Sequence, residues 1–111
     1  MAVIVKTLVQ PLQLANTQTT LYTATNVRAT LDKVTVTNTD TVARTFSLNL
    51  VQSGLIASNS NLLVDDKTVQ PNETYTCPEV VGHSLDNGAF ISVIASAASA
   101  LTLRISGREY S

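Results

Sequence analysis

The chain has 111 residues, a formal net charge of −1 and only 14% charged side chains, about half the usual share. This length predicts one domain with one core, and the absence of a basic cluster argues against a nucleic-acid-binding protein. The single cysteine, Cys77, excludes an internal disulfide. No stretch approaches the roughly 20 apolar residues of a membrane span, and no basic residues precede the first apolar run as in a signal peptide. We therefore expect a protein made in a cytoplasm, without a membrane segment.

The first fifteen residues are apolar but follow neither a helical nor an alternating pattern. Pro11 removes a backbone donor, so a central strand is excluded there. Two interpretations stay open for residues 1–15. They form a first strand that lies on the core, or an arm that lies on another subunit or a larger partner, since an apolar terminus suits strand addition.

The clearest strand pattern covers residues 31–52. Val34 and Val36 alternate with threonines before a polar break at residues 38–41, and a second alternating run begins at Phe46. Period-two alternation places one set of side chains on each face of a strand. We therefore predict an antiparallel hairpin, whose apolar face must be covered because an isolated hairpin is only marginally stable.

The following stretch, residues 52–61, is rich in serine and asparagine and is predicted to be a loop. Leu55 and Ile56 are unusual in such a loop. Either they fix the loop to the core or they are exposed contacts for a partner. Short strands are expected at residues 62–64 and 73–77, where the second ends at a proline.

A second pair of alternating runs covers residues 90–95 and 101–105, separated by a turn of small residues at 96–99. We predict another hairpin, packed against the first. About eight short strands, spaced as in a jelly roll, predict an all-β, single-domain antiparallel β-sandwich. The domain organisation is then an N-terminal strand or arm, residues 1–15, followed by a β-sandwich domain, residues 16–111.

Residues for catalysis or metal binding are sparse. The one histidine, His83, lies six residues after Cys77, but Cys77 sits between a threonine and a proline, as a buried structural thiol would, and we expect His83 to be half-buried. One cysteine and one histidine exclude a zinc site, and a surface calcium site at Asp65 and Asp66 lacks the usual ligand pattern. We expect no catalytic residues, no metal and no cofactor, and hence no enzyme.

The order of these segments resembles a group of small structural proteins of tailed bacteriophages, over about residues 20–109. The resemblance is strongest to the small capsid decoration, or staple, proteins of epsilon-fifteen-type podophages. It is carried by a Leu-Tyr-Thr-Ala strand beginning at Leu21, the alternating runs of residues 34–51, the Pro-Asn-Glu-Thr turn beginning at Pro71, the Leu-Asp-Asn-Gly-Ala-Phe-Ile element beginning at Leu85, and the alanine- and serine-rich hairpin that ends in Ile-Ser-Gly-Arg-Glu at Glu109.

The resemblance implies a jelly-roll sandwich on the outer surface of a phage capsid. Its partners would be the major capsid protein and a second copy of the chain, with a homodimer favoured and a trimer possible, and with neither nucleic acid nor membrane. A tail or neck component, or a receptor- or carbohydrate-binding module with a groove lined by Tyr22, Tyr75 or Tyr110, is the alternative. The residues that we expect to contact a partner are Val3, Ile4, Val5 and Leu8 first, and Leu55 and Ile56 second.

Overall fold

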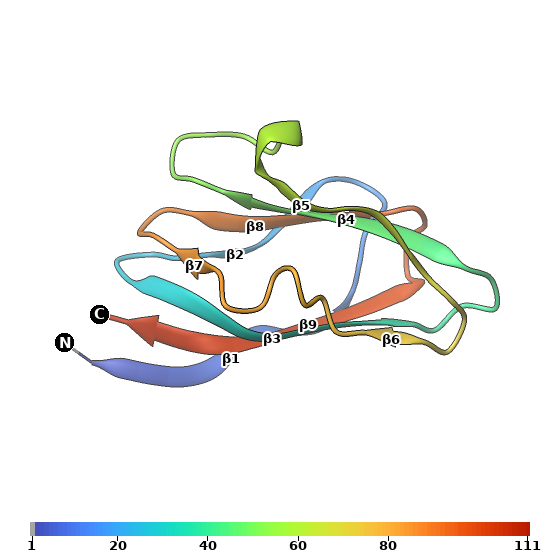
Figure 1. Ribbon diagram of the computed structural model, residues 1–111, viewed down its shortest axis with the longest axis horizontal. Coiled ribbons are helices and arrows are strands. Elements are labelled where there is room, and N and C mark those ends of the chain that lie inside the picture. The colour runs from blue at the N-terminus through green and yellow to red at the C-terminus, as the bar shows by residue number, and fades with distance from the viewer. Residues whose placement is uncertain (1) are drawn as a thin grey trace.

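A computed structural model describes residues 2–111 and shows two antiparallel β-sheets stacked face to face (Figure 1). The β1 sheet has the strand order β1-β9-β3-β6, with β7 also paired to β3, and the β2 sheet has the order β2-β8-β4-β5. Within these residues no helix is long and apolar enough to cross a bilayer. The elements are β1 Val3–Gln13, β2 Thr19–Thr23, β3 Arg28–Asn38, β4 Arg44–Val51, the 3-10 turn η1 Asn59–Asn61, β5 Leu62–Val69, β6 Thr74–Tyr75, β7 Ser84–Leu85, β8 Phe90–Ala95 and β9 Leu101–Tyr110.

The connectivity is that of a jelly roll. Strands β6 and β7 both pair with β3 and are separated by an irregular segment, so they act as one interrupted strand. The eight resulting strands divide into four in each sheet, and the chain crosses from one sheet to the other at every connection between them except the one from β4 to β5. The predicted all-β sandwich is therefore confirmed.

The core lies between the inner faces of the two sheets. Period-two alternation places Val34 and Val36 of β3 and Phe46 and Leu48 of β4 in it, all at most 1% exposed. Strand β9 contributes alternate residues of its first half in the same way. The further large side chains that are buried there are Leu14, Leu31, Leu85, Ile91, Leu101, Leu103 and Ile105.

The two predicted hairpins are wrong. Strand β3 pairs with β9 and β6 in one sheet, whereas β4 pairs with β8 and β5 in the other. In the same way, β8 and β9 lie in different sheets. Alternation shows which side chains face the core, but two strands on opposite sides of that core carry the same pattern as two hydrogen-bonded neighbours. Both turns are therefore corners at which the chain crosses from one sheet to the other.

The β3–β4 corner is held by the buried side chain of Asn38. Its amide Nδ2 donates to the carbonyl oxygens of Val42, at 2.9 Å, and Val69 of β5, at 2.8 Å, while its Oδ1 accepts the N–H of Asp40. Asn38 belongs to the β1 sheet and Val69 to the β2 sheet, so one amide bridges the two layers. An asparagine that appears in the sequence as a loop residue is thus part of the interior.

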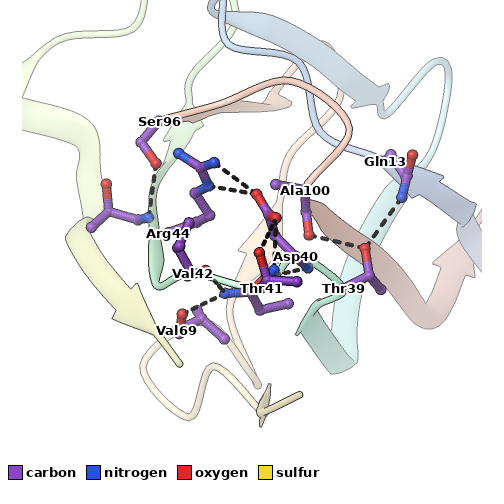
Figure 2. A network of polar contacts seen from close by, with 11 residues as sticks. Gln13, Thr39, Asp40, Thr41, Val42, Arg44, Val69, Ser96 and Ala100 are labelled. Atoms are coloured by element: carbon purple, nitrogen blue, oxygen red, sulfur yellow. Dashed lines mark hydrogen bonds and ion pairs between the residues drawn. The ribbon is translucent and has the colours of Figure 1, made fainter. Parts of the chain in front are cut away.

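The β8–β9 corner lies against the β3–β4 corner. Figure 2 shows Asp40 paired with Arg44, and Thr39 between Gln13 and Ala100. The N–H of Thr39 donates to the carbonyl of Ala100 at 2.9 Å, and the N–H of Ser96 donates to the carbonyl of Thr45 at 2.8 Å. Both crossings therefore close the same end of the sandwich.

Candidate partner interface

The first three apolar residues of β1 are exposed although they belong to a regular strand. Val3 is 55% exposed, Ile4 53% and Val5 77%. Strand β1 pairs with β9 along one side only and forms an outer edge of its sheet, which also explains how Pro11 is accommodated within it. Residues 3–13 thus form a strand of this chain, and the exposed side chains of Val3, Ile4 and Val5 are free to contact a partner.

Leu8, expected beside them as a partner contact, lies in the core instead and is only 9% exposed. The pairing of β1 with β9 shifts between Thr7, opposite Ser106, and Val9, opposite Ile105, so Leu8 is an extra residue in a β-bulge. The bulge changes the phase of the alternation, and both Leu8 and Val9 are buried. The sequence prediction missed this because a bulge leaves no period-two signal.

Leu55 and Ile56 lie in the loop between β4 and η1 and are 58% and 79% exposed. Of the two alternatives that the sequence left open, the structure therefore shows the one in which Leu55 and Ile56 are exposed and do not fix the loop to the core. The loop is held by Asn49, whose Nδ2 donates to Ser58 O at 2.9 Å, and by Asn61, whose Nδ2 donates to Ile56 O at 2.9 Å. Polar side chains position the loop, and the two apolar side chains remain in solvent.

Among the described residues, five of the exposed large apolar side chains are those expected to contact a partner, and the others are Val42 and Val81. We call Val3, Ile4 and Val5, which lie at the free edge of β1, the strand patch, and Leu55 and Ile56 the loop patch. The strand patch belongs to the β1 sheet and the loop patch to a connection within the β2 sheet, so they lie on opposite layers of the sandwich (Figure 1). That these residues contact a partner stays a prediction.

The carboxylate of Glu109, next to the strand patch, connects β1 and β9 of one sheet with β2 of the other. Glu109 of β9 accepts hydrogen bonds from the hydroxyl of Tyr22 in β2 and from Lys6 Nζ in β1, the latter at 3.2 Å. The hydrogen bond from Tyr22 and then the contact with Lys6 hold the pKa of Glu109 below its ordinary value. The start of β1 is thereby fixed to its own sheet by charge as well as by the backbone ladder.

Acidification is expected to weaken this connection. A carboxylate with a depressed pKa in the folded state stabilises the fold above its unfolded-state pKa, and this contribution is lost as the pH falls through the folded-state pKa. Stability should therefore decrease below about pH 4.5, and Glu109→Gln should reduce that decrease. Urea unfolding midpoints of both proteins between pH 7 and pH 3 measure the difference. An equal acid dependence of the two proteins would contradict the role of Glu109.

A polar groove lies on the outer face of the β2 sheet, with a volume of about 340 Å³. It is formed where Ser47 of β4 faces a bulge of β5, because two residues, Asp65 and Asp66, oppose this one serine. Ser47 Oγ accepts the N–H of Asp66 at 2.9 Å. The residues that line the groove are Gln18, Ser47, Asn49, Ala57, Ser58, Asn59, Leu62, Asp65, Asp66 and Ile94.

The tyrosines expected to line a sugar-binding groove do not line this one. Tyr22 donates its hydroxyl to Glu109, and Tyr75 of β6 donates its hydroxyl to Glu79. Asp65 and Asp66 stood out in the sequence as a possible calcium site, but the other polar residues of the groove were missed because β4 alternates inward apolar and outward polar residues, a pattern that also describes an ordinary solvated face. The sequence does not reveal the β5 bulge, which lines the groove together with the loop at residues 57–59.

Cys77 and His83 do not share a solvent-accessible site. Cys77 is completely buried in the core, and burial raises the pKa of its thiol to about 12, so the thiol is protonated at neutral pH. His83, expected to be half-buried, is exposed, and its backbone carbonyl accepts the N–H of Leu31 at 3.0 Å. Among residues 2–111 no three or more histidine, cysteine, aspartate or glutamate side chains group as metal ligands.

Comparison with protein-family models, with curated protein sequences and with solved structures gives no match for this chain.

Proposed function

We propose that this protein is a structural component of a phage particle that decorates the outside of the capsid and staples neighbouring capsomers. The observation that carries the proposal is the pair of exposed apolar surfaces, the strand patch and the loop patch, on opposite layers of one sandwich. The resemblance of residues 20–109 to phage decoration proteins supports the same role. The partners would be the major capsid protein and further copies of this chain, in a homodimer or a trimer, without catalysis or a cofactor.

A rigid body with two separated contact surfaces suits a staple. Once one surface is bound, the second binds intramolecularly, and the combined affinity exceeds either single affinity by about 10²–10⁴-fold. Each contact can therefore be weak alone. The sandwich transmits load between the two surfaces because its core side chains are closely packed and resist deformation.

Polar substitutions in either patch are expected to weaken capsid binding. Val3→Ser with Val5→Ser, and Leu55→Ser with Ile56→Ser, should each raise the dissociation constant about 10- to 100-fold, because each removes one of two linked contacts. Co-sedimentation with expanded capsids that lack the protein measures this binding. The matched control is Val42→Ser, which changes a 48% exposed valine in the β3–β4 corner, away from both patches.

Two outcomes would contradict the proposal. One is full-affinity binding by both double variants. The other is a copy number in purified particles far below that of the capsid protein, which would favour a tail or neck component.

The polar groove supports a second candidate, a carbohydrate-binding module. Amide, hydroxyl and carboxylate side chains such as Gln18, Asn59 and Asp65 can hydrogen-bond sugar hydroxyl groups, with Ile94 as an apolar contact. Calorimetric titration with the glycans of the host surface tests this function. Binding that is lost in Asn59→Ala would support it over the staple.

A further inference from the structure

The free edges of the two sheets are protected against pairing with another chain, except at one place. The edge strand β5 carries a bulge and the charged run Asp65, Asp66 and Lys67, and the edge strands β2, β6 and β7 are short. The second half of β1 is interrupted by the bulge at Leu8, a further register shift and Pro11. Bulges, charges, proline and short length all hinder pairing with another chain. Among the described residues, the edge without a bulge, a proline or an unpaired charge is the beginning of β1, residues 2–7, where the one charged side chain, Lys6, is paired with Glu109 of the same sheet.

The backbone groups at this edge can be assigned from one hydrogen bond. The N–H of Ser111 donates to the carbonyl of Ala2 at 3.0 Å, beside the paired strands β1 and β9 (Figure 1). In an antiparallel ladder, successive residues turn their N–H and C=O groups alternately toward and away from the partner strand. The backbone groups of Val3, Val5 and Thr7 therefore point away from β9. These three residues present free donors and acceptors in a row.

We propose that a second copy of this chain pairs with this edge, antiparallel, with Val5 on the twofold axis. Val5 would then pair with Val5 of the second copy, and Val3 of each copy would pair with Thr7 of the other. Two hydrogen bonds in each of these three residue pairs give six in all. The β1 sheets of the two copies would become one continuous sheet.

The side chains favour a second copy in this register. Val3, Val5 and Thr7 share one face of β1, so an apolar or threonine side chain opposes each of them. On the other face Ile4 opposes Lys6, and no two like charges meet. If the twofold axis lay at Lys6, two lysine side chains would face each other and the bulge at Leu8 would lie in the interface. If the axis lay at Ile4, the pairing would be limited to Val3 with Val5.

This pairing supplies the self-contact of the proposed staple and rests on that function only for its role on a capsid. Its test uses the isolated protein, so the two proposals can fail separately. If the pairing is found but the protein does not bind capsids, the staple fails alone. If capsids are bound without the pairing, this inference fails alone.

Charge reversal at the axis provides a sharp test. Val5→Lys and Val5→Glu each place two like charges opposite one another, so each should be monomeric, whereas an equal mixture of the two should restore the dimer. Sedimentation equilibrium at about 0.1 mM subunit measures the mass, with dimeric wild-type protein as the expected starting point. Val42→Lys and Val42→Glu are the matched controls and should remain dimeric, because Val42 lies in the β3–β4 corner.

A second variant separates edge pairing from side-chain charge. The N–H of Val5 is not used by β9, so Val5→Pro should retain the fold while it removes both hydrogen bonds on the axis. Its dissociation constant should rise at least about 10-fold, with an unchanged far-UV circular dichroism spectrum. Monomeric wild-type protein, dimeric Val5→Lys, or a Lys/Glu mixture that stays monomeric would each overturn the inference.

Discussion

Gly107→Ala is expected to destabilise the protein by about 3 kcal/mol or more, a large part of the stability of a domain of this size. A methyl group at residue 107 would lie 2.2 Å from the carbonyl oxygen of Thr30 and 2.8 Å from Leu8 Cδ1. The oxygen cannot move aside, because Thr30 belongs to β3, which is paired with β9 on one side and β7 on the other. Overpacking against backbone in a central strand must therefore distort the β1 sheet itself.

The measurement is the free energy of unfolding in urea, compared with Gly54→Ala as the control. Gly54 lies in the loop that carries the loop patch, with a φ of +84° and nothing within 4 Å of an added methyl group. Alanine there should cost only the strain of a left-handed backbone, about 1–2 kcal/mol. Equal losses for the two variants would show that the contact with Thr30 is not the cause.

Asn38→Asp is expected to cost about 3 kcal/mol or more at neutral pH, since a buried carboxylate would replace a buried amide. The substitution keeps the shape of the side chain but turns an acceptor toward the carbonyl oxygens of Val42 and Val69, which now receive the two hydrogen bonds of Nδ2. At this end of the sandwich, the hydrogen bonds between the two sheets would be replaced by electrostatic repulsion between the carboxylate and the carbonyl oxygens.

The loss of unfolding free energy in Asn38→Asp should be larger at neutral pH than at acidic pH. Burial raises the folded-state pKa of the new carboxyl above its unfolded value, so its charge penalty is absent below about pH 4 and grows as the pH rises. Asn38→Leu, of similar size but without a titratable group, is the matched control and should show a deficit that does not vary with pH. Urea unfolding at pH 4 and pH 7 distinguishes the two. A constant deficit in Asn38→Asp would contradict a buried position for this side chain.

The sequence predicts the layers of this fold but not their connections. Alternation around Val34 and Phe46 identifies the inward faces because side-chain period depends only on local backbone geometry. It does not reveal whether the two strands are hydrogen-bonded neighbours or face each other across the core. That choice is made at the corner, where the side chain of Asn38 reaches β5, a contact between residues 31 positions apart in the chain.

The candidate interface, too, could be predicted only in part from the sequence. Apolar residues in a serine- and asparagine-rich loop marked Leu55 and Ile56 as unusual but left open whether they pack on the core, and the structure shows both exposed. Leu8 was misplaced because the sequence does not show where along β1 the core begins: Val3, Ile4 and Val5 are exposed, whereas Leu8 and Val9 are buried. The unprotected edge at Val5 could not be seen in the sequence at all, since an edge is a property of strand order.

The contact between Ala2 and Ser111 has a consequence for engineering. Because these two residues are hydrogen-bonded, a linker of a few residues could join them, and the chain could be opened instead in the loop at Gly54. Cargo fused next to Ala2 or Ser111 would emerge beside the open side of β1 and crowd it. Cargo fused to such a permuted chain would emerge from the other layer and leave that side clear.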